Sequence, residues 1–356
     1  MKSWDVIIIG GGIIGLSLSI VLRKRGASVL IVERGEPGHE ASRAAGGMLV
    51  DCLLETPPAL QPLATASARM YPEFAHAIEV ESGMKVDLRD QGTILLSVQE
   101  PAGQSDGLSH DRLTEFEPAL TEIANGYRAC YLKERSIDPR ALTAAAIKAA
   151  RNLGVDFSSG DPVTTVNLSD DHASGVTTRK TLFLAEKVVN CAGAWSSQLG
   201  PHSIPTRPVK GQMLCLAMPS RKFLQHVIRS PKAYLIPRSD GRLLIGATVE
   251  EAGFDKRTDP ATIQGLRQAA LELVPGLRAA KILEDWAGLR PGTPDNLPIL
   301  GATSTPGYFV ATGHFRDGIL LAPITAAVMA DVIEGRTPEH DLAAFSHSRF
   351  SKRQSA

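Results

Sequence analysis

Residues 5–15 read Asp-Val-Ile-Ile-Ile-Gly-Gly-Gly-Ile-Ile-Gly, an apolar run followed directly by a glycine cluster. Gly10, Gly12 and Gly15 have the Gly-x-Gly-x-x-Gly spacing that lets a strand turn sharply into a helix. Such a turn brings bare backbone close to a pyrophosphate, and the first amides of the helix donate to the phosphates. The stretch therefore predicts a dinucleotide site, although glycine turns also occur in ordinary βα units.

The residues that follow strengthen this prediction. Ile14, Leu18 and Leu22 recur at helical spacing, and Gly26 supplies a stop before a second apolar strand at residues 29–32. Glu33 ends that strand, close to the roughly 20 residues past the last glycine at which a carboxylate grips a ribose. A strand, a glycine turn, a helix, a strand and an acid thus occur in the order expected for an adenine dinucleotide.

The length and the composition of the chain limit the classes of function that it can have. The chain has 356 residues, enough for two lobes, and is 43% hydrophobic and 21% charged. Lys plus Arg equals Asp plus Glu, 38 each, so no general attraction to nucleic acid is expected. No other apolar run is long enough for a membrane span, and four scattered cysteines suggest reduced thiols. We expect a cytoplasmic protein without a metal, a membrane partner or a nucleic-acid partner.

Further along the chain, helix and strand patterns alternate. Asp138-Pro139 is a strong helix start, and Gly335 follows the last helical pattern. Residues 100–111 are expected to form a loop or a short ordered detour, and residues 176–184 a strand. Short strands with hairpin turns dominate from residue 206 onwards. The expected helices span residues 63–78, 139–152, 260–274 and 319–334.

Motifs beyond residue 205 carry a family resemblance. They are residues 207–212, 234–248 (Tyr-Leu-Ile-Pro-Arg-Ser-Asp-Gly-Arg-Leu-Leu-Ile-Gly-Ala-Thr), 286–295 and 313–323, together with 5–15 and 41–49. The chain resembles the D-amino-acid-oxidase-like FAD-dependent oxidoreductases, and within them the bacterial glycine oxidases of thiamine biosynthesis. The resemblance implies an α/β fold with a discontinuous Rossmann-like FAD-binding domain, residues 1–80, 136–205 and 301–356. A mostly antiparallel substrate domain would comprise residues 81–135 and 206–300.

The resemblance also implies roles for individual residues. Arg290 and Tyr234 would bind the substrate carboxylate, with Arg316 nearby, and an arginine fork suits a carboxylate in a dry pocket. His314 is expected to be mainly structural, ahead of the final helix. FAD, held non-covalently, would contact Gly10, Gly12, Ile13, Ile14, Gly15, Glu33, Arg34, Ser42, Arg43, Ala45, Gly46, Gly47, Met48, Val163, Ala192, Gly193, Trp195, His314, Gly318, Ile319 and Leu320.

The implied reaction is hydride transfer from the Cα of glycine to flavin N5, giving an imine that hydrolyses to glyoxylate and ammonia. O₂ would be reduced to H₂O₂, and the imine would supply thiamine thiazole synthesis. An oxidase or dehydrogenase acting on sarcosine or a small D-amino acid is an alternative, which leaves the electron acceptor open, and FAD-dependent tRNA modification is a more remote one. The chain departs from the family pattern at Lys232, Val249 and Val50 and in the short segment 98–117, which leaves the substrate and a possible homo-oligomer open.

Overall fold

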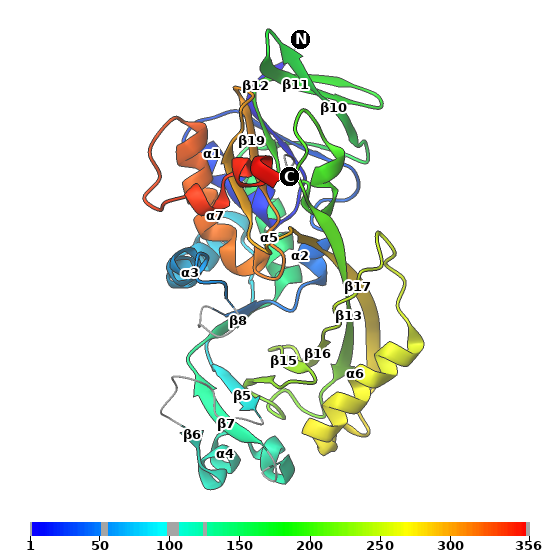
Figure 1. Cartoon of the computed structure of the whole chain (residues 1–356). Helices are drawn as coiled ribbons and strands as arrows, with labels where there is room; N and C mark the ends of the chain where they lie inside the picture. The colour runs from blue at the N-terminus through cyan, green and yellow to red at the C-terminus, as the bar shows by residue number, and fades with distance from the viewer. Residues whose placement is uncertain (1, 51–55, 98–106, 124–126, 354–356) are drawn as a thin grey trace.

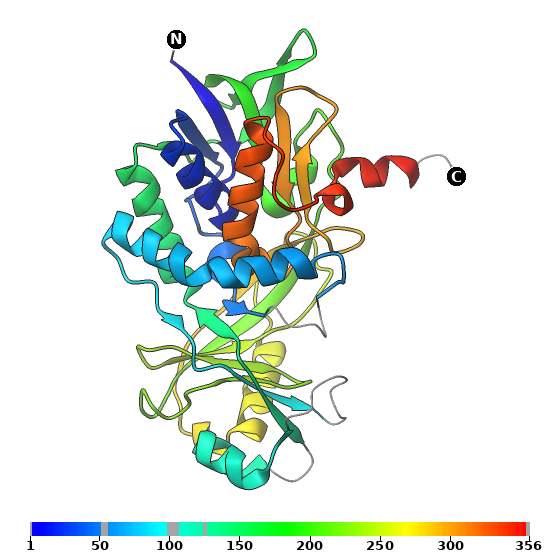
Figure 2. The ribbon, with the colours of Figure 1, turned by 90° about the vertical axis from the view of Figure 1, so that its left-hand side faces the viewer.

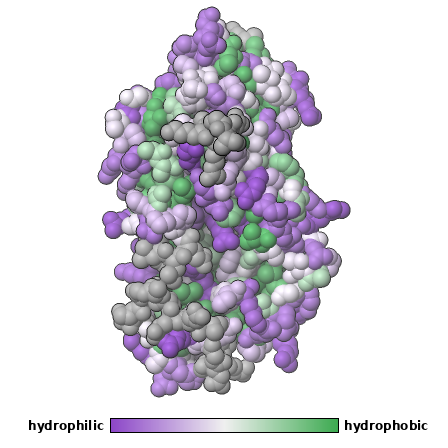
Figure 3. All heavy atoms as spheres, viewed as in Figure 1, coloured by the Kyte–Doolittle hydropathy of each residue, from purple (hydrophilic) through white to green (hydrophobic). Residues whose placement is uncertain are grey.

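A computed structural model describes residues 2–50, 56–97, 107–123 and 127–353 (Figure 1). Two eight-stranded sheets dominate it, one toward each end of an elongated molecule (Figures 1 and 2). We call them the first and the second sheet. Hydrophilic side chains cover much of the face seen in Figure 3. In the ranges described, no helix combines the length and the apolar character that a membrane span requires.

The first sheet is built on parallel strands. β1 (Ser3–Ile9) lies between β2 (Val29–Glu33) and β12 (Leu182–Asn190), and every residue of β2 is buried. Continuous apolar runs of this kind are typical of parallel strands covered on both faces. The other members are β9 (Asp156–Ser159), β10 (Val163–Ser169), β11 (His172–Thr178), β18 (Ile299–Ala302) and β19 (Tyr308–Thr312).

Four helices pack with this sheet in one hydrophobic core: α1 (Ile13–Lys24), α3 (Gln61–Ser82), α5 (Pro139–Asn152) and α7 (Gly318–Ile333). The Asp138 carboxylate caps α5 by accepting from the amide of Arg140 at 2.8 Å. Ser67 on α3 donates to the Leu320 carbonyl at 2.6 Å and thereby ties down the first turn of α7. The start of α7 is therefore fixed by a helix distant in sequence.

The second sheet is mostly antiparallel. Its order is β17-β13-β16-β15-β14-β5-β7-β6, and β14 with β5 is its parallel pair. The short helix α4 (His110–Phe116) and the helix α6 (Pro260–Leu273) accompany it (Figure 1). The strands are β5 (Thr93–Ser97), β6 (Gly107–Leu108), β7 (Arg128–Leu132), β13 (Arg207–Ala217), β14 (Val227–Arg229), β15 (Tyr234–Pro237), β16 (Arg242–Gly246) and β17 (Ile282–Gly292).

A three-stranded sheet is formed by segments in which the chain passes from one large sheet to the other. It contains β3 (Met48–Leu49), β8 (Arg135–Ile137) and β4 (Leu88–Arg89), paired antiparallel. The short helix α2 (Ala41–Ala44) precedes β3. These elements place residues 41–49 between the first and the second sheet.

One of the expected elements was wrong. The strand expected at residues 176–184 is divided, because β11 ends at Thr178 and β12 begins at Leu182 after a hairpin turn. The segment expected at residues 100–111 as a loop or a short ordered detour is ordered where it is described, because it includes β6 and the first residues of α4, for which Ser109 is the cap. Residues 98–106 lie outside the described ranges. The division into two domains with the stated boundaries stays a prediction.

Candidate functional site

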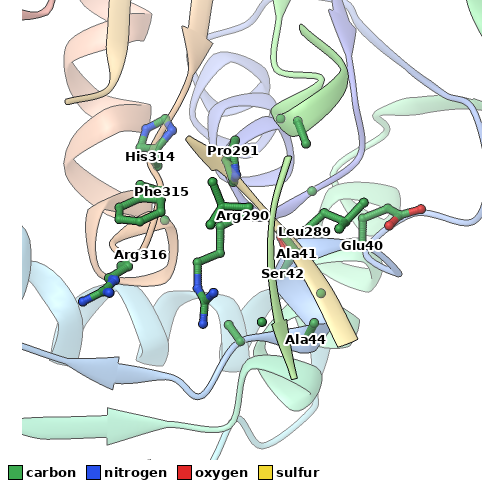
Figure 4. A pocket seen from close by; sticks show the side chains of 18 of the residues that line it. Glu40, Ala41, Ser42, Ala44, Leu289, Arg290, Pro291, His314, Phe315 and Arg316 are labelled. Carbon is green, nitrogen blue, oxygen red and sulfur yellow. The ribbon is translucent and has the colours of Figure 1, made fainter. Parts of the chain in front are cut away.

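A cavity of about 1660 Å³ is lined by residues from both large sheets. The glycine turn after β1, residues 44–48 and the segment before α7 line it from one side. Strands β13, β15 and β17 of the second sheet contribute the other side. Figure 4 shows Leu289, Arg290 and Pro291 of β17 together with residues 40–42, 44 and 314–316. The cavity is therefore the place where the predicted dinucleotide turn and the predicted substrate residues meet.

The glycine turn has no space for side chains. Gly10 has φ +107°, and a Cβ there would lie 2.5 Å from the carbonyl oxygen of Cys191. A Cβ on Gly15 would overlap the Gly10 carbonyl, so this glycine lets α1 approach the turn. Ser42 accepts from the Ile13 amide at 2.9 Å and caps α1 from another segment. The bare turn and the helix start suit a pyrophosphate.

Glu33 is held in place from two sides. The residue is 8% exposed, and its carboxylate accepts from the amides of Gly11 and Gly35, each at 2.8 Å. A carboxylate has about four acceptor positions, so capacity remains for ribose hydroxyls. Next to it, the Arg34 guanidinium lies 3.7 Å from the centre of the Trp195 ring. This end of the cavity fits the ribose and adenine part of a dinucleotide.

The segment at residues 44–47 is positioned by the second sheet. Trp286 on β17 donates to the Ala44 carbonyl at 3.1 Å, and Arg238 donates to the Gly46 carbonyl. Arg238 is fully buried, and burial lowers its pKa to about 10 despite the attraction of Asp138. The backbone of this segment is thus fixed where it lines the cavity, as a planar ligand placed against it requires.

The start of α7 forms another wall. Gly318 and Ile319 line the cavity, and the first amides of a helix have no partner within that helix. His314, immediately before the helix, is 3% exposed and lies 3.1 Å from the Thr325 hydroxyl. Burial lowers the pKa of His314 to about 3, so its ring is neutral. The ring of His314 therefore adds no charge of its own to the positive dipole end of the helix.

Arg290 extends from β17 across β13. Its Nη1 donates to the carbonyls of Thr248 at 3.0 Å and Lys210 at 3.3 Å, and Gly211 leaves the space that the guanidinium fills. Burial lowers the pKa of Arg290, and within the described ranges its guanidinium is in no ion pair with a carboxylate. A partly buried cation of this kind favours an anionic ligand.

Tyr234 on β15 lies next to this arginine. Its hydroxyl donates to the Met213 sulfur at 3.3 Å, and a Cβ on Gly246 would lie 2.8 Å from that hydroxyl. Burial raises the pKa of Tyr234, while the charge of Arg290 lowers it in part, so the phenol stays protonated at neutral pH. Arg290 and Tyr234 together offer a charged fork and a neutral donor.

Arg316 belongs to the same cavity but is more open. Its side chain is exposed, and its guanidinium lies 5.3 Å from the centre of the Phe315 ring. In Figure 4 the side chains of Arg290 and Arg316 extend in the same general direction from neighbouring segments. Arg316 therefore adds positive charge beside the pair formed by Arg290 and Tyr234.

All the predicted site residues line the cavity except Gly15, Arg43 and Leu320. Gly15 packs α1 against the turn, Arg43 is exposed, and the Leu320 side chain is buried in the core. The divergent positions Val50, Lys232 and Val249 also line it. Sequence reasoning missed the neighbours that shape the site, Gly211, Met213 and Gly246, although a glycine inside a strand often marks a close approach.

Comparisons with known proteins agree on one family. A family model described as FAD dependent oxidoreductase matches residues 5–332. The bifunctional protein ThiO/ThiG of Trichormus variabilis is 35% identical over 99% of this chain, and the chain spans 56% of its length. Glycine oxidase of Geobacillus kaustophilus is 33% identical over 97% of each chain. The crystal structure of glycine oxidase from Geobacillus kaustophilus superposes with a TM-score of 0.91, 33% identity and coverage of 97% of this chain and 98% of that chain.

Proposed function

Because the chain belongs to the family of FAD-dependent oxidoreductases, we propose that it oxidises a small amino acid, with glycine as the first candidate. In the proposed reaction glycine, O₂ and water give glyoxylate, ammonia and H₂O₂. FAD is the cofactor of the family, and the bare glycine turn and the carboxylate of Glu33 fit it. Oxidation of sarcosine or a small D-amino acid is the alternative.

The observation that carries this proposal is the placement of Arg290 and Tyr234 in the cavity that also contains the glycine turn. The guanidinium of Arg290 binds the substrate carboxylate through two parallel hydrogen bonds, and its two carbonyl acceptors hold it in orientation. The hydroxyl of Tyr234, kept protonated by burial, donates to the same carboxylate. One end of the substrate is then fixed, and the bond to be broken is oriented.

The other residues serve the cofactor and the charge that develops on it. Bound FAD supplies the chemistry, because it accepts the hydride from the substrate Cα. Gly318 and Ile319, at the start of α7, would hold the ring system with their amides and offer it positive dipole character, and Arg316 would add a full charge on the same side of the cavity. Ala45, Gly46 and Gly47 are proposed to lie against the same ring system.

Three further residues that line the cavity are candidates for setting the size of the substrate. Val249 and Val50 line the cavity, and both are branched and apolar. Lys232 is paired with Glu272 at 2.7 Å, so its charge is partly compensated. We propose that these residues bound the space next to the substrate Cα and nitrogen and so decide between glycine and its N- or C-substituted relatives.

A metabolic role follows from the same reaction. The resemblance to glycine oxidases of thiamine biosynthesis supports the proposal that the imine product feeds thiazole formation. Deletion of this protein in its host is then expected to impose a requirement for the thiazole precursor. Growth without that supplement would contradict the metabolic role and leave the proposed chemistry intact.

The direct test is a peroxide assay over glycine, sarcosine, D-alanine and D-proline with the purified yellow protein. We expect glycine to give the highest kcat/KM. If only sarcosine or the D-amino acids are oxidised, the proposed substrate changes from glycine to one of these compounds. A preparation that stays colourless after incubation with FAD would contradict the cofactor assignment itself.

A further inference from the structure

A loop of the second sheet reaches the first-sheet side of the molecule. It comprises residues 249–258, between β16 and α6, and we call it the strap. Its beginning is anchored by reciprocal backbone hydrogen bonds between Glu250 and Lys210, at 2.9 and 3.0 Å. Its end is anchored by the Thr258 hydroxyl, which donates to Asp285 at 2.6 Å. Both anchoring partners, Lys210 and Asp285, lie on strands of the second sheet. The middle of the strap is therefore the part that crosses to the first-sheet side.

The first contact of the crossing part is aromatic. Phe254 stacks on Trp195, with ring centroids 5.2 Å apart and an angle of 30° between the ring planes. Trp195 lies in the short helix after β12, on the first-sheet side, and the Arg34 guanidinium lies 3.7 Å from its ring centre. Phe254 remains 42% exposed, so burial in a core does not explain its position. The strap thus contacts Trp195, which together with Arg34 lies at the end of the cavity that is proposed to hold the adenosine of FAD.

The second contact is electrostatic. The Lys256 ammonium pairs with the Glu40 carboxylate at 3.1 Å, and Arg34 pairs with the same carboxylate at 3.2 Å. Glu40 immediately precedes α2 and lines the cavity. Two cations therefore share one anion, and the cluster carries one more positive than negative charge at the proposed adenosine end of the cavity.

We propose that the strap is part of the FAD site and slows the release of the cofactor. This inference rests on the cofactor position proposed above. Trp195 and Glu40, which the strap contacts, line the cavity, as do Val249 and Glu251 of the strap itself. Arg34, which contacts both Trp195 and Glu40, lines it as well. If the strap only braced the two sheets against each other, its two partners on the first-sheet side would not both need to be residues that line the cavity. Phe254 and Lys256 are positioning residues for the cofactor in this account.

The rate of FAD release tests the proposal, measured by the recovery of free-flavin fluorescence after dilution of the holoenzyme. We expect Phe254→Ala and Lys256→Ala each to accelerate release on the order of 5-fold, as loss of one aromatic pair or one partly exposed ion pair predicts. Lys256→Arg is expected to restore slow release, because it keeps the pair with Glu40. Higher ionic strength should accelerate release in the wild type more than in Lys256→Ala.

Matched variants away from the cavity provide the controls. Phe116→Ala removes an exposed aromatic pair with Tyr131, and Lys85→Ala removes an exposed pair with Glu79 at 2.8 Å. Both are expected to release FAD at the wild-type rate. Strap variants that release FAD no faster than these controls would overturn the proposal.

A second readout separates cofactor retention from bracing of the fold. The rise in Tm between the apo and the FAD-loaded protein is expected to shrink in Phe254→Ala and Lys256→Ala. Equal losses of Tm in the apo and loaded forms would show a brace alone and overturn the proposal. If the wild-type protein binds FAD but does not oxidise glycine, the proposed substrate is ruled out. The role of the strap in FAD release can still be tested in the same way.

Discussion

The guanidinium of Arg290 lies directly against the Cα of Gly211. A Cβ at position 211 would come closer to both Nη1 and Nη2 than real Cβ contacts do. Gly211 is on β13, and it pairs with Gly288 on β17, the strand that carries Arg290. The side chain therefore crosses to the neighbouring strand through a gap that only glycine leaves.

Gly211→Ala is expected to displace Arg290 and weaken carboxylate binding. Overpacking of this kind costs about 1–3 kcal/mol, and if this cost appears in substrate binding, the apparent KM for glycine rises roughly 5- to 150-fold. Gly265→Ala is the control, because that glycine lies within α6 with no atom near its Cβ position. Steady-state kinetics on both variants checks the prediction, and a normal KM in Gly211→Ala would contradict it.

Tyr234→Phe is expected to remove one donor to the substrate carboxylate while keeping the ring. A hydrogen bond to a charged group contributes about 1.5–3 kcal/mol, so kcat/KM for glycine should fall roughly 10- to 100-fold. Tyr131→Phe removes a hydroxyl that donates to the Gln91 carbonyl at 3.1 Å outside the cavity and should leave kcat/KM unchanged. Equal kinetics for Tyr234→Phe and the wild type would remove Tyr234 from the substrate site.

His314 is expected to make the fold less stable in mild acid. Its pKa is lowered to about 3 from 6.5, so the unfolded chain binds a proton that the folded chain excludes. This stability is present above pH 6.5 and is lost as the pH falls, by about 1.4 kcal/mol per unit between roughly pH 6 and 4. His314→Gln should reduce that slope in urea unfolding of the apo protein, and an unchanged slope would contradict the assignment.

The elements predicted best were those with local signals. Asp138-Pro139 marks the start of α5, and the predicted helix at residues 319–334 is observed as α7, Gly318–Ile333. The hairpin after Thr178 has no such signal. Its turn is held by Asp161, whose carboxylate accepts from the Thr178 hydroxyl at 2.6 Å and the Arg179 amide at 3.2 Å. A turn stabilised by a carboxylate distant in sequence is not visible in a local pattern.

The residues of the candidate site likewise divide into those with a local sequence signal and those without one. The glycine turn and Glu33 were predicted from local spacing, whereas the roles of Arg290 and Tyr234 required the family resemblance. The space for Arg290 depends on the register of β13 against β17, and the space for Tyr234 depends on Gly246. Contacts such as Phe254 with Trp195 depend on the packing of the two sheets. Neither kind of contact follows from periodicity or composition.

The most direct test of the account is the apparent KM for glycine of Arg290→Ala at saturating FAD. Loss of a partly buried charge partner predicts a KM on the order of 100-fold higher or more, with the flavin absorbance spectrum and the FAD affinity retained. Arg316→Ala, at the exposed neighbouring cation, should change KM less. A KM for Arg290→Ala within about 3-fold of the wild type, a change under 1 kcal/mol, would contradict Arg290 as the carboxylate anchor.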